Sequence, residues 1–202
     1  MARVIVYFAH PGQRYSHVNK AMQAEAKKID EVTHVDLYAE YPRFDINQDR
    51  EQQRLLDHDV VVFQFPLFWY STPSILKEWQ DLVLEHGFAY GAGGEKLAGK
   101  RMLLAISAAG PKDAYCADGY QHFDLRTFLR PLEQTANLCK MIFLPPYVLY
   151  GSLKAPNAGT IAPHAQGFGQ LLEALRDDRL DAGKAGPDEV LGFDTLPIRQ
   201  EA

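Results

Sequence analysis

The sequence has few cysteines: among 202 residues only Cys116 and Cys139 occur, far apart in the chain. They form neither a C-x-x-C pair nor a zinc-ligand spacing, so a reducing, intracellular setting is favoured over a disulfide scaffold. No apolar run reaches the roughly 18 residues of a membrane span. The N-terminus lacks the apolar core of a signal peptide. We therefore expect a cytoplasmic protein, either free or held at the inner face of the cell membrane by a partner.

An excess of positive charge is also missing. The chain has 21 Lys and Arg against 26 Asp and Glu, which gives a net charge of −5. This balance argues against nucleic acid as a partner. Hydrophobic residues make up 47% of the sequence, as in ordinary globular proteins. We expect a single domain over residues 1–180, followed by a loosely ordered polar tail over residues 181–202.

Several catalytic motifs are absent. The sequence has no G-x-G-x-x-G after its first strand, no G-x-S-x-G and no H-E-x-x-H, and its seven histidines show no ligand spacing. We therefore expect no metal site and no Rossmann dinucleotide site. The stretch GEKLAGK at residues 94–100 matches the start of a phosphate-binding P-loop. Arg101 follows it where Ser or Thr is required, and a strand follows where a helix is required, so the stretch is a turn.

Strand patterns and helix patterns alternate along the chain. The expected strands cover residues 3–9, 33–38, 59–65, 101–107 and 140–144, and Pro145-Pro146 interrupts or ends the last one. The expected helices cover residues 16–29, 48–57, 73–86, 124–138 and 161–179. This alternation predicts an α/β three-layer sandwich, with a parallel sheet between helices. Five strands favour the flavodoxin-like order 2-1-3-4-5, which binds ligands at the carboxyl ends of strands one and three.

The loop after the first strand, AHPGQRYSHVNK at residues 9–20, has the chemistry of a phosphate cradle. It leads into a helix N-terminus, which favours an anion, and it contains no acidic residue. Hydroxyl, imidazole, amide and cationic groups are all present in it. They belong to His10, Arg14, Ser16, His17, Asn19 and Lys20. The alternative is an ordinary helix cap, with Ser16 as N-cap, next to a solvated loop.

The loop after the third strand is aromatic. Its sequence FPLFWYSTP, residues 65–73, places Phe68, Trp69 and Tyr70 side by side at a turn. Turns normally favour Gly, Asn or Asp. Such a cluster at the edge of a sheet indicates a flat aromatic ligand, whereas the alternative is packing into the protein or a dimer interface.

The loop after the fourth strand, SAAGPKDAYCADGYQHFD at residues 107–124, combines small residues with two acid–base groups. Ala108, Ala109 and Gly110 would let the backbone approach a ligand closely. Tyr115 and His122 could act in proton transfer at the same crevice, although a lone Tyr or His is more often structural.

Four segments together resemble a known family. AHPGQRYSHVNK, FPLFWYSTPSILKEWQDLV, HGFAYG and LAGKRMLLAIS are similar to flavodoxin-fold NAD(P)H:quinone oxidoreductases, and most of all to the ancillary flavoproteins of glutathione-gated potassium efflux systems. The resemblance covers residues 3–180. It implies FMN in preference to FAD, NAD(P)H as donor, two-electron ping-pong reduction of a quinone, and a homodimer. It also implies an alternative function, as a regulatory subunit on the cytoplasmic domain of a potassium efflux antiporter.

The resemblance also implies roles for individual residues. The phosphate side would be His10, Ser16, His17, Val18 and Asn19. The segment along the isoalloxazine would be Pro66, Leu67, Phe68, Trp69 and Tyr70, with Trp69 and Tyr70 beside the space where nicotinamide and quinone stack. The pyrimidine end would face Ala108, Ala109, Gly110 and Pro111, where Ala109 and Pro111 replace glycines of the family pattern. Tyr115 would assist hydride transfer, and His122 lies one position away from the matching histidine.

Overall fold

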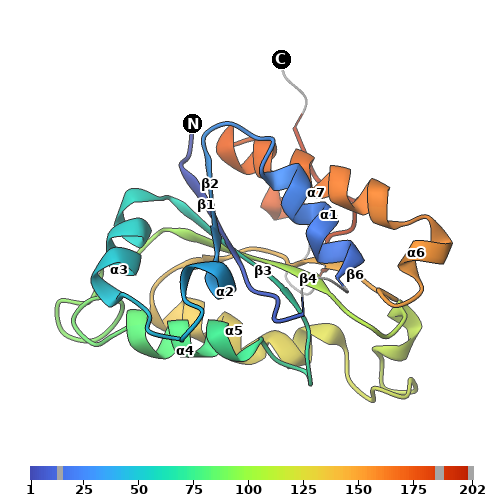
Figure 1. The fold of residues 1–202 in the computed structure, drawn as a ribbon, viewed down its shortest axis with the longest axis horizontal. Helices are drawn as coiled ribbons and strands as arrows, with labels where there is room; N and C mark the ends of the chain where they lie inside the picture. The colour runs from blue at the N-terminus through green and yellow to red at the C-terminus, as the bar shows by residue number, and fades with distance from the viewer. Residues whose placement is uncertain (13–15, 185–188, 200–202) are drawn as a thin grey trace.

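The structure is a computed structural model and describes residues 1–12, 16–184 and 189–199. Its strands form a parallel sheet in the order β2-β1-β3-β4-β5, and β6 also pairs with β4 (Figure 1). The strands are β1 (Val4–Phe8), β2 (Val32–Asp36), β3 (Val60–Pro66), β4 (Arg101–Ser107), β5 (Ile142–Phe143) and β6 (Tyr147–Leu149). This order confirms the predicted flavodoxin-like architecture.

Helices cover both faces of the sheet. They are α1 (His17–Ala26), α2 (Leu37–Glu40), α3 (Gln48–Asp57), α4 (Ser74–Val83), α5 (Leu125–Leu138), α6 (Ala155–Ala158) and α7 (Ile161–Arg176). Helices α1 and α7 lie together on one face, whereas α3, α4 and α5 lie on the other (Figure 1). None of the helices in the described part of the chain has both the length and the apolar character that crossing a membrane requires.

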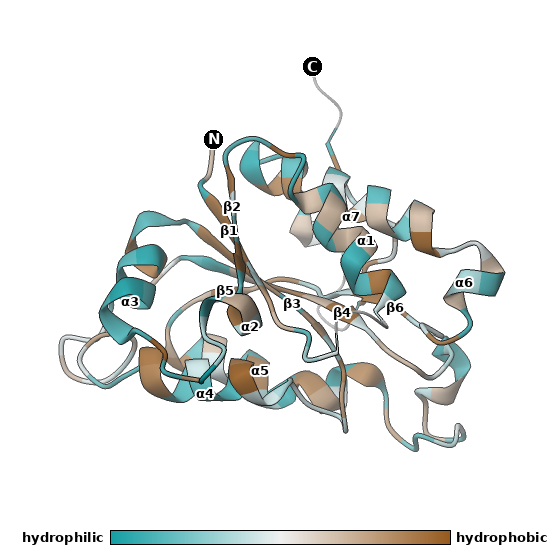
Figure 2. Ribbon diagram, in the orientation of Figure 1, coloured by the Kyte–Doolittle hydropathy of each residue, from teal (hydrophilic) through white to brown (hydrophobic). Residues whose placement is uncertain are grey.

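The core has two halves, one on each face of the sheet. Along β1, Val4 and Val6 face α1 and α7, whereas Ile5 and Tyr7 face the opposite layer. All residues of β1 and β3 are buried, as expected for parallel strands covered on both faces. Figure 2 shows the result: β1 is mostly brown, and the outward side of α3 is mostly teal. The continuous apolar runs of the sequence are therefore the inner strands.

The fifth strand is broken into two short pieces. Pro145-Pro146 separates β5 from β6, and both pieces pair with β4, at Arg101–Met102 and at Ala105–Ser107. Proline has no N–H to donate to a sheet, so the ladder is interrupted and then resumes. The predicted interruption is confirmed, and the strand continues beyond it.

Several predicted bounds differ from the structure. The strand predicted to run to residue 38 ends at Asp36, and α2 begins at Leu37. The Asp36 carboxylate accepts a hydrogen bond from the Ala39 amide at 3.2 Å, so this residue caps a short helix and does not continue the strand. Helices α1, α4 and α7 each end three residues earlier than predicted.

The described part of the C-terminal segment lies against the domain, which differs from the expectation of a loose tail. The Leu191 amide donates to the Pro146 carbonyl at 2.8 Å, and the Val148 amide donates to the Leu191 carbonyl at 2.9 Å. The Leu191 side chain is buried beside β6, which gives the segment an apolar anchor at the sheet edge. Residues 185–188 and 200–202 of the predicted tail lie outside the described residues.

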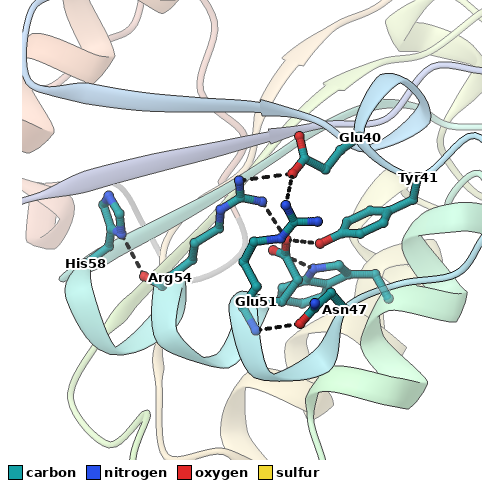
Figure 3. Close-up of polar contacts among 8 residues, drawn as sticks. Glu40, Tyr41, Asn47, Glu51, Arg54 and His58 are labelled. Carbon is teal, nitrogen blue, oxygen red and sulfur yellow. Dashed lines mark hydrogen bonds and ion pairs between the residues drawn. The ribbon is translucent and has the colours of Figure 1, made fainter.

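A buried carboxylate joins three segments on the α3 face (Figure 3). Glu51 is completely buried and accepts hydrogen bonds from the Tyr41 hydroxyl at 2.5 Å, Arg54 Nη1 at 2.5 Å and Trp79 Nε1 at 3.1 Å. Burial and the bond to Glu51 raise the pKa of Tyr41 to about 12. We call these four residues the Glu51 cluster. Both carboxylate oxygens have donors, so the cluster ties the chain after α2 to α3 and α4.

Candidate functional site

A cavity of about 590 Å³ opens at the carboxyl edge of the sheet, at the ends of β1, β3 and β4. It lies at the switch point where flavodoxin-like sheets bind ligands. Its wall consists of His10, Pro11, Gly12, Ser16, His17, Val18, Asn19, Pro66, Leu67, Phe68, Ser107, Ala109, Ser152, Leu153 and Pro156. Segments that are distant in the sequence therefore meet here, as the topology predicts.

The first wall of the cavity is the N-terminal end of α1. Ser16 occupies the N-cap position, but its hydroxyl makes no capping hydrogen bond, and the first turn contains no acidic residue. The first amide groups of a helix have no partner within the helix and carry partial positive charge. This end of the cavity can therefore bind an anion. All five predicted phosphate-side residues, His10 and residues 16–19, line it, whereas Arg14 lies outside the described residues.

His10 contributes a neutral imidazole to this wall. Burial lowers the pKa of His10. The Gly12 amide donates to His10 Nδ1 at 3.2 Å, so Nδ1 is an acceptor and the ring proton lies on Nε2. The ring lies edge-on against Phe68, with 5.6 Å between the ring centroids. His10 thus connects the anion-binding wall with the apolar wall.

The floor of the cavity is polar and buried. Asn19 Nδ2 donates to Ser107 Oγ at 2.7 Å, and Gln64 Nε2 donates to the main-chain oxygen of Asn19 at 2.8 Å. In the described part of the chain, two buried oxygens of the cavity wall have no hydrogen-bond partner, Ser16 Oγ and Asn19 Oδ1. Gln64 Oε1 is also unpaired, but Gln64 does not line the cavity. Buried polar atoms are normally satisfied, so unpaired atoms beside a cavity indicate a site for a polar ligand.

The second wall is apolar and comes from the end of β3. Pro66, Leu67 and Phe68 line the cavity, and the Leu67 amide donates to the Ser107 carbonyl at 2.9 Å. Trp69 and Tyr70 follow directly but do not line the cavity of a single chain. Tyr70 packs on Phe128 of α5 with 4.8 Å between ring centroids, and Trp69 is 92% exposed.

Trp69 and Tyr70 form a tight turn with unusual backbone angles. Their φ values are +48° and +64°, and the Phe68 and Ser71 backbones exchange hydrogen bonds of 3.1 and 3.0 Å around them. Turns with positive φ at both central residues normally contain Asn-Gly or Gly-Gly. Bulky side chains at these positions cost stability, and such strain is concentrated at functional sites. The turn holds the Trp69 ring out in solvent, one residue after the cavity-lining Phe68.

The loop after β4 only partly reaches the cavity. Ala109 lines it, whereas Ala108 is buried in the core and its amide donates to the Leu149 carbonyl at 2.8 Å. Gly110 and Pro111 do not line the cavity. A Cβ on Gly110 would lie 3.1 Å from the Tyr115 ring and 2.9 Å from the Tyr120 hydroxyl. Gly110 is therefore needed for the close packing of its own loop.

Tyr115 and His122 lie away from the cavity of the single chain. Tyr115 packs against Tyr150 with 5.5 Å between ring centroids and lines a separate hollow beside Arg126 and Asp124. Burial is the main cause of its raised pKa, which keeps the hydroxyl protonated at neutral pH. His122 is exposed and has a positive φ of 62°. The structure therefore does not bring these two predicted catalytic residues to the cavity wall.

Six residues of the wall were not predicted as site residues from the sequence. Two of them, Pro11 and Gly12, lie within the predicted phosphate loop. Ser107 ends β4 at the carboxyl edge of the sheet, and this position could have identified it. Ser152, Leu153 and Pro156 belong to the loop and short helix after β6. The proline break in the fifth strand concealed where that strand reaches the edge. In the described ranges, no group of three or more His, Cys, Asp or Glu side chains is placed to hold a metal ion.

Comparisons with known proteins agree with this geometry. Residues 2–172 match the model of a family described as having a flavodoxin-like fold. An uncharacterized NAD(P)H oxidoreductase of Bacillus subtilis, YrkL, is 46% identical over 151 residues, covering 75% of this chain and 87% of the relative. The potassium-efflux ancillary protein KefG of Cronobacter sakazakii is 42% identical over 171 residues, covering 85% of this chain and 92% of the relative.

Solved structures give the same fold under different descriptions. General stress protein 14 of Treponema denticola, in complex with FMN, has a TM-score of 0.80, 34% identity, and coverage of 86% and 99% of the two chains. A chain described as a thermophilic tryptophan halogenase from Streptomycin violaceusniger has a TM-score of 0.80, 40% identity, and coverage of 84% and 98%. An NADPH-quinone reductase of P. pentosaceus has a TM-score of 0.71, 27% identity, and coverage of 86% and 97%.

The family match spans most of the chain, and curated relatives exceed 40% identity over most of their own length. The sheet order and the cavity position agree with that match. The chain therefore belongs to the flavodoxin-like fold family, together with relatives named as NAD(P)H oxidoreductases and potassium-efflux ancillary proteins.

Proposed function

We propose that the protein is a flavin-dependent NAD(P)H:quinone oxidoreductase that binds FMN in the cavity between α1 and β3. The observation that carries this proposal is the pairing of an anion-favouring helix end with an apolar wall across one 590 Å³ cavity. FMN has a phosphate at one end and a flat ring at the other. The FMN-bound general stress protein and the relative named as an NAD(P)H oxidoreductase support the same cofactor and donor.

The residues at the helix end would hold the phosphate. The first-turn amides of α1, the Ser16 hydroxyl and the Nε2–H of His10 would offer donors, and no carboxylate in the first turn opposes a dianion. The lowered pKa of His10 keeps it neutral, so it would contribute a hydrogen bond and not a full charge. FAD would need further room for its adenylate, so FMN is the preferred cofactor.

The residues of the apolar wall would orient the ring. Pro66, Leu67 and Phe68 would lie along it, and Ala109 would lie near its pyrimidine end. Bound FMN supplies two-electron chemistry, taking a hydride equivalent from NAD(P)H and delivering it to a quinone. In the proposed ping-pong order the donor leaves before the quinone enters the same space. Trp69 and Tyr70 would border that space in a homodimer, where the exposed Trp69 ring would be covered.

Tyr115 and His122 are proposed as the acid groups for the quinone. Tyr115 has a raised pKa and is therefore a hydrogen-bond donor at neutral pH, as stabilisation of a quinone oxyanion requires. Because neither residue lines the cavity of one chain, this role requires the loop of residues 108–122 to approach the ring edge when the site is filled. Tyr115→Phe should reduce quinone turnover about 100-fold while FMN stays bound. Turnover equal to wild type would remove Tyr115 from the mechanism.

The direct test of the proposed function is spectroscopic. The purified protein, supplied with FMN, is expected to show flavin absorbance that bleaches with anaerobic NAD(P)H and recovers on addition of menadione. Failure to bind FMN or FAD would overturn the cofactor assignment. Binding without bleaching would overturn the reductase assignment and favour the second candidate function.

That second candidate is a regulatory role, and the relative named KefG favours it. We propose that the protein could act as an ancillary subunit on the cytoplasmic domain of a potassium efflux antiporter, with its reductase activity secondary. This partnership would place a cytoplasmic protein at the inner face of the membrane. Potassium efflux measured with wild type and with a reductase-deficient variant separates the two functions, because regulation by binding alone would survive the loss of turnover.

A further inference from the structure

Gln64 is a polar residue in the middle of an otherwise apolar strand. Strand β3 has the sequence VVVFQFP, and the Gln64 side chain is 0% exposed. Burying a side-chain amide is unfavourable unless hydrogen bonds replace those to water. An aliphatic residue would satisfy the packing of this strand, so the amide requires an explanation beyond the core.

The amide of Gln64 reaches the helix that forms the cavity wall. Its Nε2 donates to the main-chain oxygen of Asn19, 45 positions away in the sequence and within the first turn of α1, at 2.8 Å. A carbonyl oxygen has two lone pairs, so Asn19 can accept this bond in addition to the normal helical one. Because the oxygen only accepts, the nitrogen of the Gln64 amide must face it.

The same turn of α1 is also tied to β4. Asn19 Nδ2 donates to Ser107 Oγ at 2.7 Å, and the Ser107 carbonyl accepts from the Leu67 amide at 2.9 Å. Side-chain and main-chain bonds therefore run from α1 to β4 and back to the end of β3. Both walls of the cavity, Ser16–Asn19 and Pro66–Phe68, are connected through this set of bonds.

We propose that Gln64 is a positioning residue that fixes the first turn of α1 relative to the apolar wall. Gln64 does not line the cavity and would not touch the ligand. It would act through Asn19, setting where the free amides of α1 point. The identity of the ligand rests on the proposed function. The positioning itself is a property of the protein without ligand.

This role predicts a specific loss of phosphate recognition. If Gln64 holds the anion-binding end in place, Gln64→Leu should weaken binding of FMN about tenfold, the effect of one lost hydrogen bond. Binding of riboflavin, which has the same ring but no phosphate, should change less than twofold. A general loosening of the core would instead weaken both ligands equally.

The chain offers a matched control on the same helix. Gln23 is also buried, one turn further along α1, and its Nε2 has no hydrogen-bond partner. Gln23→Leu makes the same chemical change without removing a bond to the cavity floor. Ser107→Ala breaks the second tie and should also weaken FMN more than riboflavin. If the ratio of FMN affinity to riboflavin affinity in Gln64→Leu equals the ratio in wild type and in Gln23→Leu, the positioning role is wrong.

A measurement on the flavin-free protein separates this inference from the cofactor assignment. The Lys20 amide donates to the Ser16 carbonyl at 3.3 Å in the first turn of α1. Gln64→Leu should accelerate hydrogen exchange at this amide about tenfold relative to Gln23→Leu, because the turn loses its anchor. Equal exchange rates would overturn the inference even if FMN binds. Faster exchange together with a wild type that binds no flavin would overturn only the proposed function.

Discussion

Two sets of buried polar groups lie on opposite faces of the sheet and differ in how completely they are paired. In the Glu51 cluster both carboxylate oxygens have donors from Tyr41, Arg54 and Trp79 (Figure 3). At the cavity floor, bonds join Gln64, Asn19 and Ser107. Among the described residues, neither Oδ1 of Asn19, which lines the cavity, nor Oε1 of Gln64, which does not, has a partner. Glu51 and Gln64 are both completely buried, so burial alone does not distinguish the two sets.

The difference indicates a division of roles between the two faces. A buried carboxylate with its donors in place joins segments of the chain and makes removal of one partner costly. A polar floor with unpaired atoms stabilises the fold less, but the unpaired oxygen of Asn19, which lines the cavity, is prepared for a ligand that donates to it. The α3 face is therefore the structural face, and the α1 face carries the site.

The largest loss of stability is expected from removing the Glu51 carboxylate. Glu51→Ala would leave the Tyr41 hydroxyl, the Trp79 indole N–H and one Arg54 contact without their acceptor. Loss of one partner from a buried charged cluster costs about 3–5 kcal/mol of unfolding free energy. Urea denaturation of wild type and variant measures the loss.

Glu51→Gln is the matched control, because it keeps the shape and one acceptor oxygen. It should destabilise the protein by about 1–2 kcal/mol, less than Glu51→Ala. Similar losses for both variants would mean that the carboxylate charge, and not the unpaired donors, determines the stability.

A second large loss of stability is expected in acid, through a buried histidine that belongs to neither set. His164 of α7 stacks on Tyr147, with 4.2 Å between ring centroids, and neither ring nitrogen has a partner. Burial lowers the pKa of His164 to about 3, whereas an unfolded histidine titrates near 6.5. Between these values the unfolded state binds more protons, so stability falls as the pH falls. The contribution of His164 should lower the free energy of unfolding by about 2 kcal/mol between pH 7 and pH 5.

The His164→Phe variant isolates this contribution. It keeps a ring against Tyr147 and removes the titration, so its stability should depend less on pH than that of wild type. Urea midpoints at pH 7 and pH 5 give the difference. His34, whose pKa burial lowers to about 4, titrates in both proteins and cancels in the comparison. If the stability of wild type and of the variant depends on pH in the same way, the contribution assigned to His164 is wrong.

A smaller effect of opposite sign is expected at the turn beside the cavity. Replacing Trp69-Tyr70 with Asn-Gly suits the positive φ values of both positions and should stabilise the protein by about 1 kcal/mol. The same change should raise the KM for quinone if these rings border the substrate. A destabilised variant would mean that the Tyr70 contact with Phe128 outweighs the backbone strain.

The smallest loss of stability is expected at the cavity floor, in contrast to the Glu51 cluster. Asn19→Leu removes one hydrogen bond to Ser107 and also removes an unpaired oxygen. It should therefore cost less than about 1 kcal/mol in the flavin-free protein, even though Asn19 is buried almost as completely as Glu51. FMN affinity should nevertheless fall strongly. A stability loss as large as that of Glu51→Ala would remove the distinction between the two faces.

Much of the fold follows from patterns in the sequence. Continuous apolar runs identify β1, β3 and β4, and their alternation with helices determines the sheet order. The bounds of α3 and β4 agree with prediction. Helix α2 was missed because Leu37 and Tyr38 suit a strand equally well, and only the Asp36 cap reveals the turn into a helix. The docking of Leu191 depends on a sheet edge that a polar tail sequence does not reveal.

The site is less accessible to sequence reasoning than the fold. The ends of β1 and β3 indicated the residues that form both walls, because parallel strands share one carboxyl edge. Ser152 and Leu153 were hidden by the break at Pro145-Pro146. The positions of Trp69, Tyr115 and His122 depend on loop conformation, which residue type alone does not determine. The importance of Gln64 depends on its contact with Asn19, which lies 45 positions away in the sequence.

Thermal unfolding of the flavin-free protein with and without FMN tests whether the α1 face is a phosphate-recognising site. A ligand that completes the cavity floor stabilises the native state, by about 2.7 kcal/mol at a concentration 100 times its Kd. We expect a clear rise in Tm with FMN, a smaller rise with riboflavin at the same concentration, and the same increments in Glu51→Gln. No rise with FMN, or equal rises with FMN and riboflavin, would contradict the assignment of the α1 face as a phosphate-recognising site.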